Sequence, residues 1–317
     1  MAPNLSISLN GRHSFGGKCG DLILDAALRS GVDLPHDCRS GYCGSCTISL
    51  EKGLIFGGET ASAGQVRACQ ARLFSDLAIR VDPTPPTVVV SGNISTIETI
   101  AKNTVAVSIL TKSAMEILPG QYCKVKFKGF PERCFSPTAD MQTGGFSRHL
   151  LYFHIKQTQD GRVTPEIGTR INVGHKVRVT GPLGHAYHRR GRDNRLVLVG
   201  TGTGFAPIWA VAAAALEENP DREIALIAGT RRASSFYMGS ALRHAARYSN
   251  VKILPFVDDM PSHVPLIYRG GLKERLPKIT PDDIVFAAGA PVIVEDVKRY
   301  AERAGATFYS DPFHPTH

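Results

Sequence analysis

The stretch Cys38-Arg-Ser-Gly-Tyr-Cys43-Gly-Ser-Cys46 organises this chain, and a fourth cysteine, Cys69, follows after 22 intervening residues. Three thiols therefore lie within nine residues, and Gly41 and Gly44 stand between them. Glycine has no Cβ atom, so a backbone that contains it can fold closely around a bulky object. The pattern predicts a tight loop that wraps around a metal group.

The spacing of the four thiols indicates which metal group this is. C-x4-C-x2-C followed by a distant cysteine is the ligand pattern of a plant-type [2Fe-2S] cluster. A four-cysteine zinc site is the alternative, but zinc ligands usually come as two short pairs, whereas here three cysteines lie close together and the fourth lies far along the chain. A disulfide framework is less favoured in a long chain of this kind. We expect the metal ligands to be Cys38, Cys43, Cys46 and Cys69.

Length and composition set the size and the compartment of the protein. The chain has 317 residues, of which 43% are apolar, which is enough for two or three domains with their own cores. It does not begin with a basic and then apolar signal segment, and its best apolar run, 208–216, is too short to span a membrane. We expect a cytoplasmic protein, not bound to a membrane, in which Cys19, Cys123 and Cys134 stay free thiols.

The net charge of +9 is concentrated in the middle of the chain. Residues 1–82 contain 8 Lys and Arg against 8 Asp and Glu, residues 83–190 contain 14 against 6, and residues 191–317 contain 15 against 14. A solvated basic surface is the simplest explanation. No basic stripe is interleaved with aromatic residues, so we expect no nucleic acid binding. The local excess fits an anionic cofactor or an acidic partner better.

The first 82 residues read as a small sheet with one helix. Residues 22–29 have helical apolar spacing and are followed by Gly31, and residues 47–50 and 77–81 alternate as strands. This β-grasp arrangement resembles the plant-type ferredoxins, and Val66-Arg-Ala-Cys-Gln70 is similar to the segment that carries their fourth ligand. Asp82-Pro-Thr-Pro-Pro-Thr87 then reads as a stiff spacer. We expect a ferredoxin domain at 1–82 and a linker at 83–92.

The middle third reads as short strands separated by turns, which favours an antiparallel β-barrel. Four segments resemble the flavin-binding barrel of the ferredoxin–NADP reductase superfamily: Pro119-Gly-Gln-Tyr122, Arg133-Cys-Phe-Ser136, Phe153-His-Ile-Lys156 and Gly161-Arg-Val-Thr164. The resemblance implies an FAD-binding β-barrel domain, which we place at 93–191.

In that superfamily an Arg-x-Tyr-Ser motif holds the flavin. The resemblance implies that Arg133 clamps the pyrophosphate, that Phe135 packs on the flavin in place of tyrosine, and that Ser136 is a catalytic residue facing flavin N5. Without it, Ser136 could be a turn residue before Pro137, and His154 a paired strand histidine. The resemblance also places two triplets on the pyrophosphate and adenosine side: His154, Ile155, Lys156 and Arg162, Val163, Thr164.

From Arg195 onward short apolar strands alternate with helices, which predicts an α/β domain with a parallel sheet. Gly200-Thr-Gly-Thr-Gly-Phe-Ala-Pro207 precedes a helix and can cradle phosphate with its backbone N–H groups. It does not match the G-x-G-x-x-G fingerprint. It resembles the G-T-G-x-x-P loop of the same superfamily, which implies that Gly202, Thr203 and Gly204 bind NAD(P) in a domain at 192–317.

Three further features concern the nucleotide and the flavin. Ala288-Gly-Ala-Pro291 resembles the superfamily's Cys-Gly-x-Pro motif near the nicotinamide, with alanine replacing cysteine, and implies roles for Gly289 and Pro291. Thr230, Arg231 and Arg232 end the second strand, where an acidic residue would favour NAD. The two arginines could hold a 2′-phosphate or be surface charge; similar reductases accept NADH with an arginine there, so we expect NADH, with NADPH as the alternative. Phe313 either stacks on the flavin, as in relatives, or packs at the chain end.

The order of the three domains resembles the reductase components of multicomponent aromatic-ring oxygenases, of the naphthalene dioxygenase and salicylate hydroxylase type. This resemblance implies an oxidoreductase that moves electrons from NADH through FAD and [2Fe-2S] to a terminal oxygenase or its Rieske ferredoxin. The alternatives are the reductase of a di-iron monooxygenase, the reductase of a sugar-nucleotide deoxygenation system, and a non-enzymatic protein with a four-thiolate zinc site.

Overall fold

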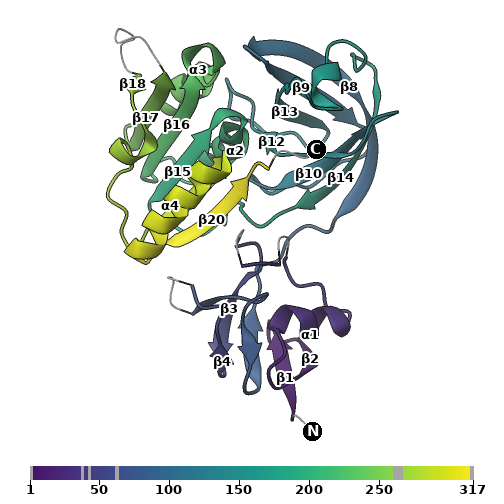
Figure 1. Ribbon diagram of the computed structural model, residues 1–317, viewed down its shortest axis with the longest axis vertical. Coiled ribbons are helices and arrows are strands. Elements are labelled where there is room, and N and C mark those ends of the chain that lie inside the picture. Colours follow the sequence, from purple (N-terminus) through teal and green to yellow (C-terminus); the bar gives the residue numbers. More distant parts are fainter. Residues whose placement is uncertain (1–2, 37–38, 42–43, 61–63, 260–266, 315–317) are drawn as a thin grey trace.

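The computed structural model describes residues 3–36, 39–41, 44–60, 64–259 and 267–314. Three larger sheets follow one another along the chain, and each has its own buried core. Figure 1 shows the sheet nearest the N-terminus as a separate lower body beneath the other two. This arrangement confirms the predicted multidomain fold.

The first domain is a five-stranded sheet with one helix, α1 (Ile23–Arg29), as the β-grasp prediction requires. The strand order is β2-β1-β7-β3-β5, with β1 paired to β7 in parallel. Apolar residues of α1, Ile23 and Leu24, are buried in the same core as Ile7 and Ile79 of the sheet. The strands are β1 (Asn4–Leu9), β2 (His13–Lys18), β3 (Thr47–Lys52), β5 (Gln65–Arg67) and β7 (Leu77–Arg80), with a separate pair β4 (Ile55–Phe56) and β6 (Arg72–Leu73).

The second domain is a nearly closed antiparallel barrel. Its strand order is β11-β10-β14-β8-β9-β13-β12, so the two edge strands, β11 and β12, are neighbours in sequence and are joined by Ser136. This residue therefore lies at the seam of the barrel. The strands are β8 (Val88–Ala101), β9 (Thr104–Thr111), β10 (Tyr122–Phe127), β11 (Arg133–Phe135), β12 (Pro137–Thr138), β13 (Leu150–Lys156) and β14 (Lys176–Leu183).

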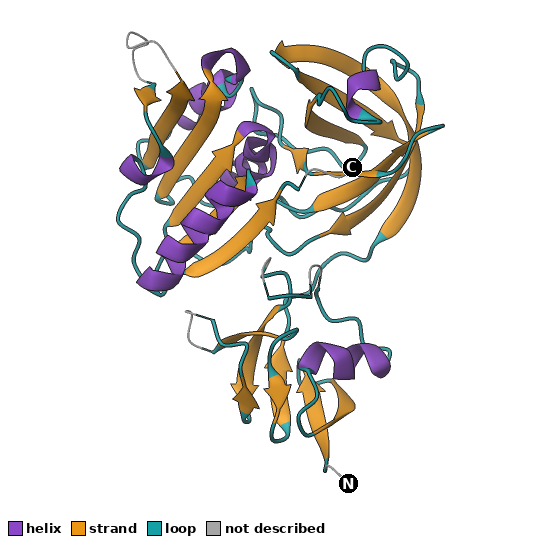
Figure 2. Cartoon of the chain, viewed as in Figure 1, coloured by secondary structure: helices purple, strands orange, loops and turns teal. Residues whose placement is uncertain are grey.

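The third domain is a parallel sheet with helices on both faces, visible in Figure 2. Leu196 and Leu198 of β15 share a core with α2 and α3, while Val197 and Val199 share one with α4, because successive strand residues face opposite sides. The strands, in the order β18-β17-β16-β15-β19-β20, are β15 (Leu196–Thr201), β16 (Ile224–Arg232), β17 (Val251–Asp259), β18 (Tyr268–Arg269), β19 (Ile284–Gly289) and β20 (Thr307–Pro312). The helices are α2 (Phe205–Glu218), α3 (Gly239–Ala245) and α4 (Pro291–Ala304).

The strand order of the third sheet reverses between β15 and β19. Ligands of such sheets bind beyond the carboxyl ends of the strands at this point. Both glycine-containing motifs predicted to meet the nucleotide follow these two strands.

β8 begins at Val88, inside the expected linker, while the other domain boundaries stay predictions. Among the described residues, no helix is long and apolar enough to cross a membrane.

Candidate functional site

Two of the four expected cluster ligands come together in the core of the first domain. Cys46 and Cys69 are 3% and 2% exposed, and their Sγ atoms lie 3.1 Å apart. This separation is longer than an S–S bond of about 2.05 Å. The Ala68 N–H donates to the Cys46 carbonyl at 2.9 Å and holds the two segments together. Converging buried thiols fit two ligands of one metal centre; Cys38 and Cys43 lie outside the described residues.

The glycines of the cysteine loop have left-handed backbone conformations. Gly41 and Gly44 have φ of +76° and +73°, which residues with a Cβ rarely adopt. The Gln70 side chain lies against Gly41, where an added Cβ would be 2.8 Å from Gln70 Cγ. Gln70 Nε2 also lies 3.6 Å from the Cys69 sulfur, as a donor toward a ligand. No local sequence pattern marks this contact.

The barrel seam brings the predicted catalytic serine to the end of the chain. Ser136 is 6% exposed, and its hydroxyl donates a 2.6 Å hydrogen bond to Asp311 Oδ2 on β20. The two residues are 175 positions apart, so no local pattern marked Asp311. A hydrogen bond from a hydroxyl to a carboxylate belongs to one of the stronger classes of hydrogen bond. The pair joins the barrel directly to the third domain.

Arg133 and Phe135 lie beside this seam. Phe135 is half-buried, and its ring is 6.4 Å from the Phe153 ring, in an edge-on arrangement. In the described part of the chain, the hydrogen bond of the Arg133 guanidinium goes to the Glu132 carbonyl, and no carboxylate pairs with it. Its charge is therefore available for an anion, as binding to a pyrophosphate requires.

His154 faces the third domain. Its ring lies 4.9 Å from the Tyr237 ring, and the Tyr237 hydroxyl donates to the Gly202 carbonyl at 3.3 Å. Burial lowers the pKa of His154 to about 4, so the ring is neutral near pH 7. Its Nδ1 is buried without a hydrogen-bond partner among the described residues. A neutral ring with a spare nitrogen suits a hydrogen bond to a bound group rather than an ion pair with phosphate. Tyr237 lies in no motif of the sequence and was not predicted as a site residue.

The other residues implied on the pyrophosphate side do not gather into one cluster of side chains. Ile155 and Val163 are buried in the barrel core. Lys156 and Arg162 are exposed, and the Thr164 hydroxyl lies 3.1 Å from that of Thr158. Any contact of Ile155 or Val163 with a cofactor would involve their backbone, while the two basic side chains are free to reach an anion.

The glycine loop after β15 fits a phosphate. Gly202, Thr203 and Gly204 form a short 3-10 turn that leads directly into α2. Among the described residues, no side chain caps α2, and its first turn contains no acidic residue. The N–H groups and the positive end of the helix dipole are therefore left for an anion.

The second glycine motif packs tightly against the first. A Cβ on Gly204 would lie 2.4 Å from the Ala288 carbonyl carbon, and one on Gly289 would lie 2.4 Å from the Thr201 oxygen. Pro291 begins α4, and the Phe313 N–H donates to the Gly289 carbonyl at 2.8 Å. The expected nicotinamide motif and the terminal aromatic residue thus meet where the strand order reverses, between β15 and β19.

The residues expected to select the nucleotide lie at the end of β16. Arg231 and Arg232 are exposed, whereas Thr230 is buried and donates to the Arg232 carbonyl at 3.0 Å. Burial raises the pKa of Asp258 above its ordinary value, and the nearby Arg231 charge opposes that rise. Asp258 therefore offsets part of the positive charge that a 2′-phosphate would meet.

Family models match the chain in three consecutive parts. A 2Fe-2S iron-sulfur cluster binding domain covers 7–73, an oxidoreductase FAD-binding domain covers 91–188, and an oxidoreductase NAD-binding domain covers 198–299. The cofactors of the protein are accordingly [2Fe-2S], FAD and NAD(P)H, and the protein is an oxidoreductase.

Two relatives at 30% identity match nearly the whole chain. The ferredoxin–NAD(P)(+) reductase component of the naphthalene 1,2-dioxygenase/salicylate 5-hydroxylase systems of Ralstonia sp. is 30% identical over 95% of this chain and 96% of its own. The toluate 1,2-dioxygenase electron transfer component of Pseudomonas putida is 30% identical over 93% of both chains. The ferredoxin reductase in carbazole 1,9a-dioxygenase has the same fold, with a TM-score of 0.67, 22% identity and 99% coverage of both chains. The chain belongs to the family of iron–sulfur flavoprotein reductases that includes the reductase components of the naphthalene dioxygenase and salicylate hydroxylase systems.

Proposed function

We propose that this reductase takes electrons in pairs from NADH and delivers them singly to a terminal aromatic-ring oxygenase or to its intermediate Rieske ferredoxin. The observation that carries the proposal is the Ser136–Asp311 hydrogen bond, which joins the flavin barrel to the nucleotide domain beside the expected nicotinamide motif. When bound, FAD accepts a hydride from the nicotinamide, and the iron–sulfur cluster carries the electrons onward one at a time.

The barrel seam supplies a place to hold a proton. Ser136 directs its hydroxyl proton to Asp311 Oδ2, which leaves the serine oxygen able to accept a hydrogen bond from a group bound at the seam. A proton can thus move from that group to the serine oxygen while the serine's own proton moves to Asp311, so that the negative charge passes from the carboxylate to the group. Arg133 is assigned to the pyrophosphate, and Phe135 to the flavin ring.

The nucleotide domain supplies orientation. The uncapped start of α2 binds the phosphates through Gly202, Thr203 and Gly204, while Gly289 and Pro291 define where the nicotinamide lies. Phe313, whose N–H donates to the Gly289 carbonyl, would be the residue that stacks on the flavin. We place this chemistry in the cytoplasm, where NADH is available and thiolate ligands stay reduced.

The electron acceptor is proposed from the names of the relatives. The reductase component of Ralstonia sp. and the toluate dioxygenase component both serve aromatic-ring oxygenases. A cytochrome P450 is the second candidate: the reductase subunit of an Amycolatopsis aromatic O-demethylase is 28% identical over 84% of this chain, and an Amycolatopsis cytochrome P450 reductase matches with a TM-score of 0.67 and 25% identity over 98% of it.

A panel of acceptors tests this assignment. The holoprotein is reduced with NADH and mixed with a Rieske oxygenase, a Rieske ferredoxin, a di-iron hydroxylase or a cytochrome P450. Faster reduction of a Rieske centre than of the others supports the proposal. Preferential reduction of the cytochrome would favour the second candidate, and no reduction of any Rieske centre would refute the first.

A further inference from the structure

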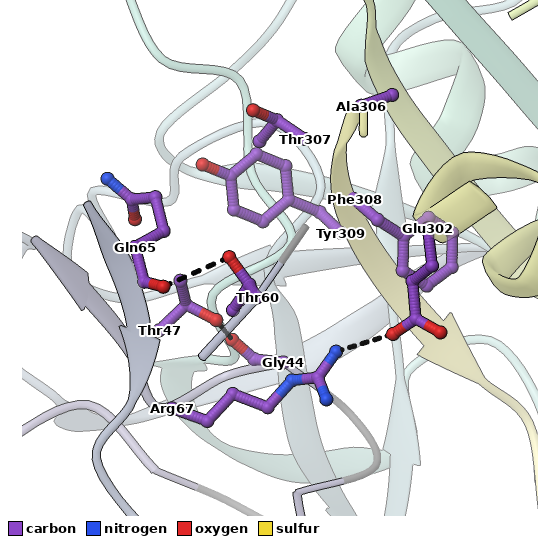
Figure 3. A pocket seen from close by; sticks show the side chains of 10 residues that line it. All are labelled: Gly44, Thr47, Thr60, Gln65, Arg67, Glu302, Ala306, Thr307, Phe308 and Tyr309. Carbon is purple, nitrogen blue, oxygen red and sulfur yellow. Dashed lines mark hydrogen bonds and ion pairs between the residues drawn. The ribbon is translucent and has the colours of Figure 1, made fainter. Parts of the chain in front are cut away.

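The two segments that carry Cys46 and Cys69 both touch the nucleotide domain. Arg67, two residues before Cys69, forms an ion pair with Glu302 of α4, with Nη2 and Oε1 2.8 Å apart. Gly44, two residues before Cys46, faces β20: an added Cβ would lie 3.8 Å from the Phe308 carbonyl oxygen. Figure 3 shows the ion pair bridging the two domains beside the start of β20. The cluster side of the ferredoxin domain is thus seated on α4 and β20.

The ion pair is partly sheltered from water. The side chains of Arg67 and Glu302 are 20% and 38% exposed. Beside them lies a small cavity of about 20 Å³, lined from both domains, which is room for about one water molecule. Arg67 Nε is buried without a hydrogen-bond partner among the described residues and can donate to such a water. Partial dehydration strengthens the pair relative to an exposed one.

A second arginine joins all three domains. Arg189 follows the last barrel strand. Its guanidinium carbon lies 4.1 Å from the ring centroid of Tyr187 and 3.9 Å from that of Tyr309. Its Nε donates at 3.0 Å to Asp82, the last residue of the expected ferredoxin domain. The Arg189 side chain is 12% exposed. One side chain therefore fixes the base of the ferredoxin domain to the barrel and to β20.

β20 connects this contact to the flavin seam. Phe308 meets the cysteine loop, and Asp311, three residues along the same strand, accepts the Ser136 hydrogen bond. Three residues of a strand span about 10 Å. The ferredoxin domain is thus seated on the strand whose other end lies at the flavin seam.

We propose that the Arg67–Glu302 ion pair and the Arg189 junction together form a docking interface, which positions the cluster to receive electrons from the flavin within the same chain. This inference rests on the proposed function. The step that it serves moves one electron from the reduced flavin to the oxidised cluster, and no covalent bond changes. An undocked ferredoxin domain remains tethered through residues 81–87, so docking sets the fraction of molecules that are competent for this step.

Charge reversal in the full-length holoprotein tests the interface. The variants are Arg67→Glu, Glu302→Arg and the double swap, and the control is Arg80→Glu, whose exposed partner Glu51 lies on the same domain at 3.3 Å. After mixing with NADH, flavin bleaching and cluster bleaching are followed separately. Each single reversal should slow cluster bleaching by about tenfold, through like-charge repulsion, and leave flavin bleaching unchanged. The swap should recover the rate to within about threefold, and the control should match the wild type.

Small-angle X-ray scattering gives a readout that needs no turnover. Each single reversal should enlarge the maximum dimension of the particle, and the swap should restore it. The inference would be overturned if both single variants bleached the cluster at the wild-type rate. It would also be overturned if the double swap, with intact cluster and flavin absorbance, bleached the cluster as slowly as the slower single variant. A wild-type protein whose flavin is not reduced by NADH would instead refute the proposed function.

Discussion

Replacing Ser136 with alanine removes the contact that joins the flavin barrel to the nucleotide domain. Ser136 is 6% exposed and its hydroxyl donates to a carboxylate at 2.6 Å, so the loss of the hydroxyl leaves Asp311 without this donor. Hydrogen bonds to charged groups contribute about 1.5–3 kcal/mol. If the full amount acts at the transition state, hydride transfer slows by about 10- to 150-fold, because each 1.36 kcal/mol is tenfold in rate.

Single-turnover mixing with saturating NADH measures this step as the loss of flavin absorbance. Ser108→Ala is a matched control, since Ser108 is also a buried barrel serine with a 2.6 Å hydroxyl hydrogen bond, to Thr96. Its flavin reduction rate should equal that of the wild type. Asp311→Asn should give an intermediate rate, because a neutral acceptor keeps the hydrogen bond but weakens it. A Ser136→Ala protein that reduces its flavin as fast as the control would refute the role of this hydroxyl.

Three further predictions concern the cluster, the nucleotide and pH. Cys69→Ser should abolish the cluster absorbance, while Cys19→Ser should leave iron and sulfide content unchanged; equal cluster content in both would remove Cys69 from the ligand set. Asp258→Asn should raise kcat/KM for NADPH relative to NADH, because it leaves the Arg231 charge unopposed for a 2′-phosphate, and an unchanged ratio would place the 2′-position elsewhere. The pKa of His154 is lowered from 6.5 to about 4, so protonation favours the unfolded chain. The unfolding free energy of the apoprotein should therefore decline as pH falls from about 6.5 to about 4, and His154→Gln should flatten that decline in chemical denaturation; an equally steep decline in the variant would contradict this.

Local patterns predicted most of the secondary structure. The helical spacing at 22–29 became α1 (Ile23–Arg29), and the short apolar strands expected after Arg195 begin with β15, because both patterns depend on neighbours a few residues away. No strand was predicted at 88–101, and β8 begins at Val88, in residues that were assigned to the linker. Its register shifts twice against β9, which interrupts the alternation by which strands are recognised.

The candidate site was less predictable, because its geometry depends on distant contacts. Spacing marked the cysteines and the glycine loop, whose chemistry is local. No sequence pattern identifies Asp311, Tyr237 or Arg189, because each contacts its partner only when separate domains meet. Their partners lie too far along the chain for a periodic pattern to reveal them.

The order in which the two redox centres change is the most direct test of the account. NADH is mixed anaerobically with the holoprotein, without an external acceptor, and the flavin and cluster bands are followed together. We predict that flavin absorbance falls first and that cluster absorbance follows. A cluster that bleaches before the flavin, or at an unchanged rate in protein stripped of flavin, would contradict it.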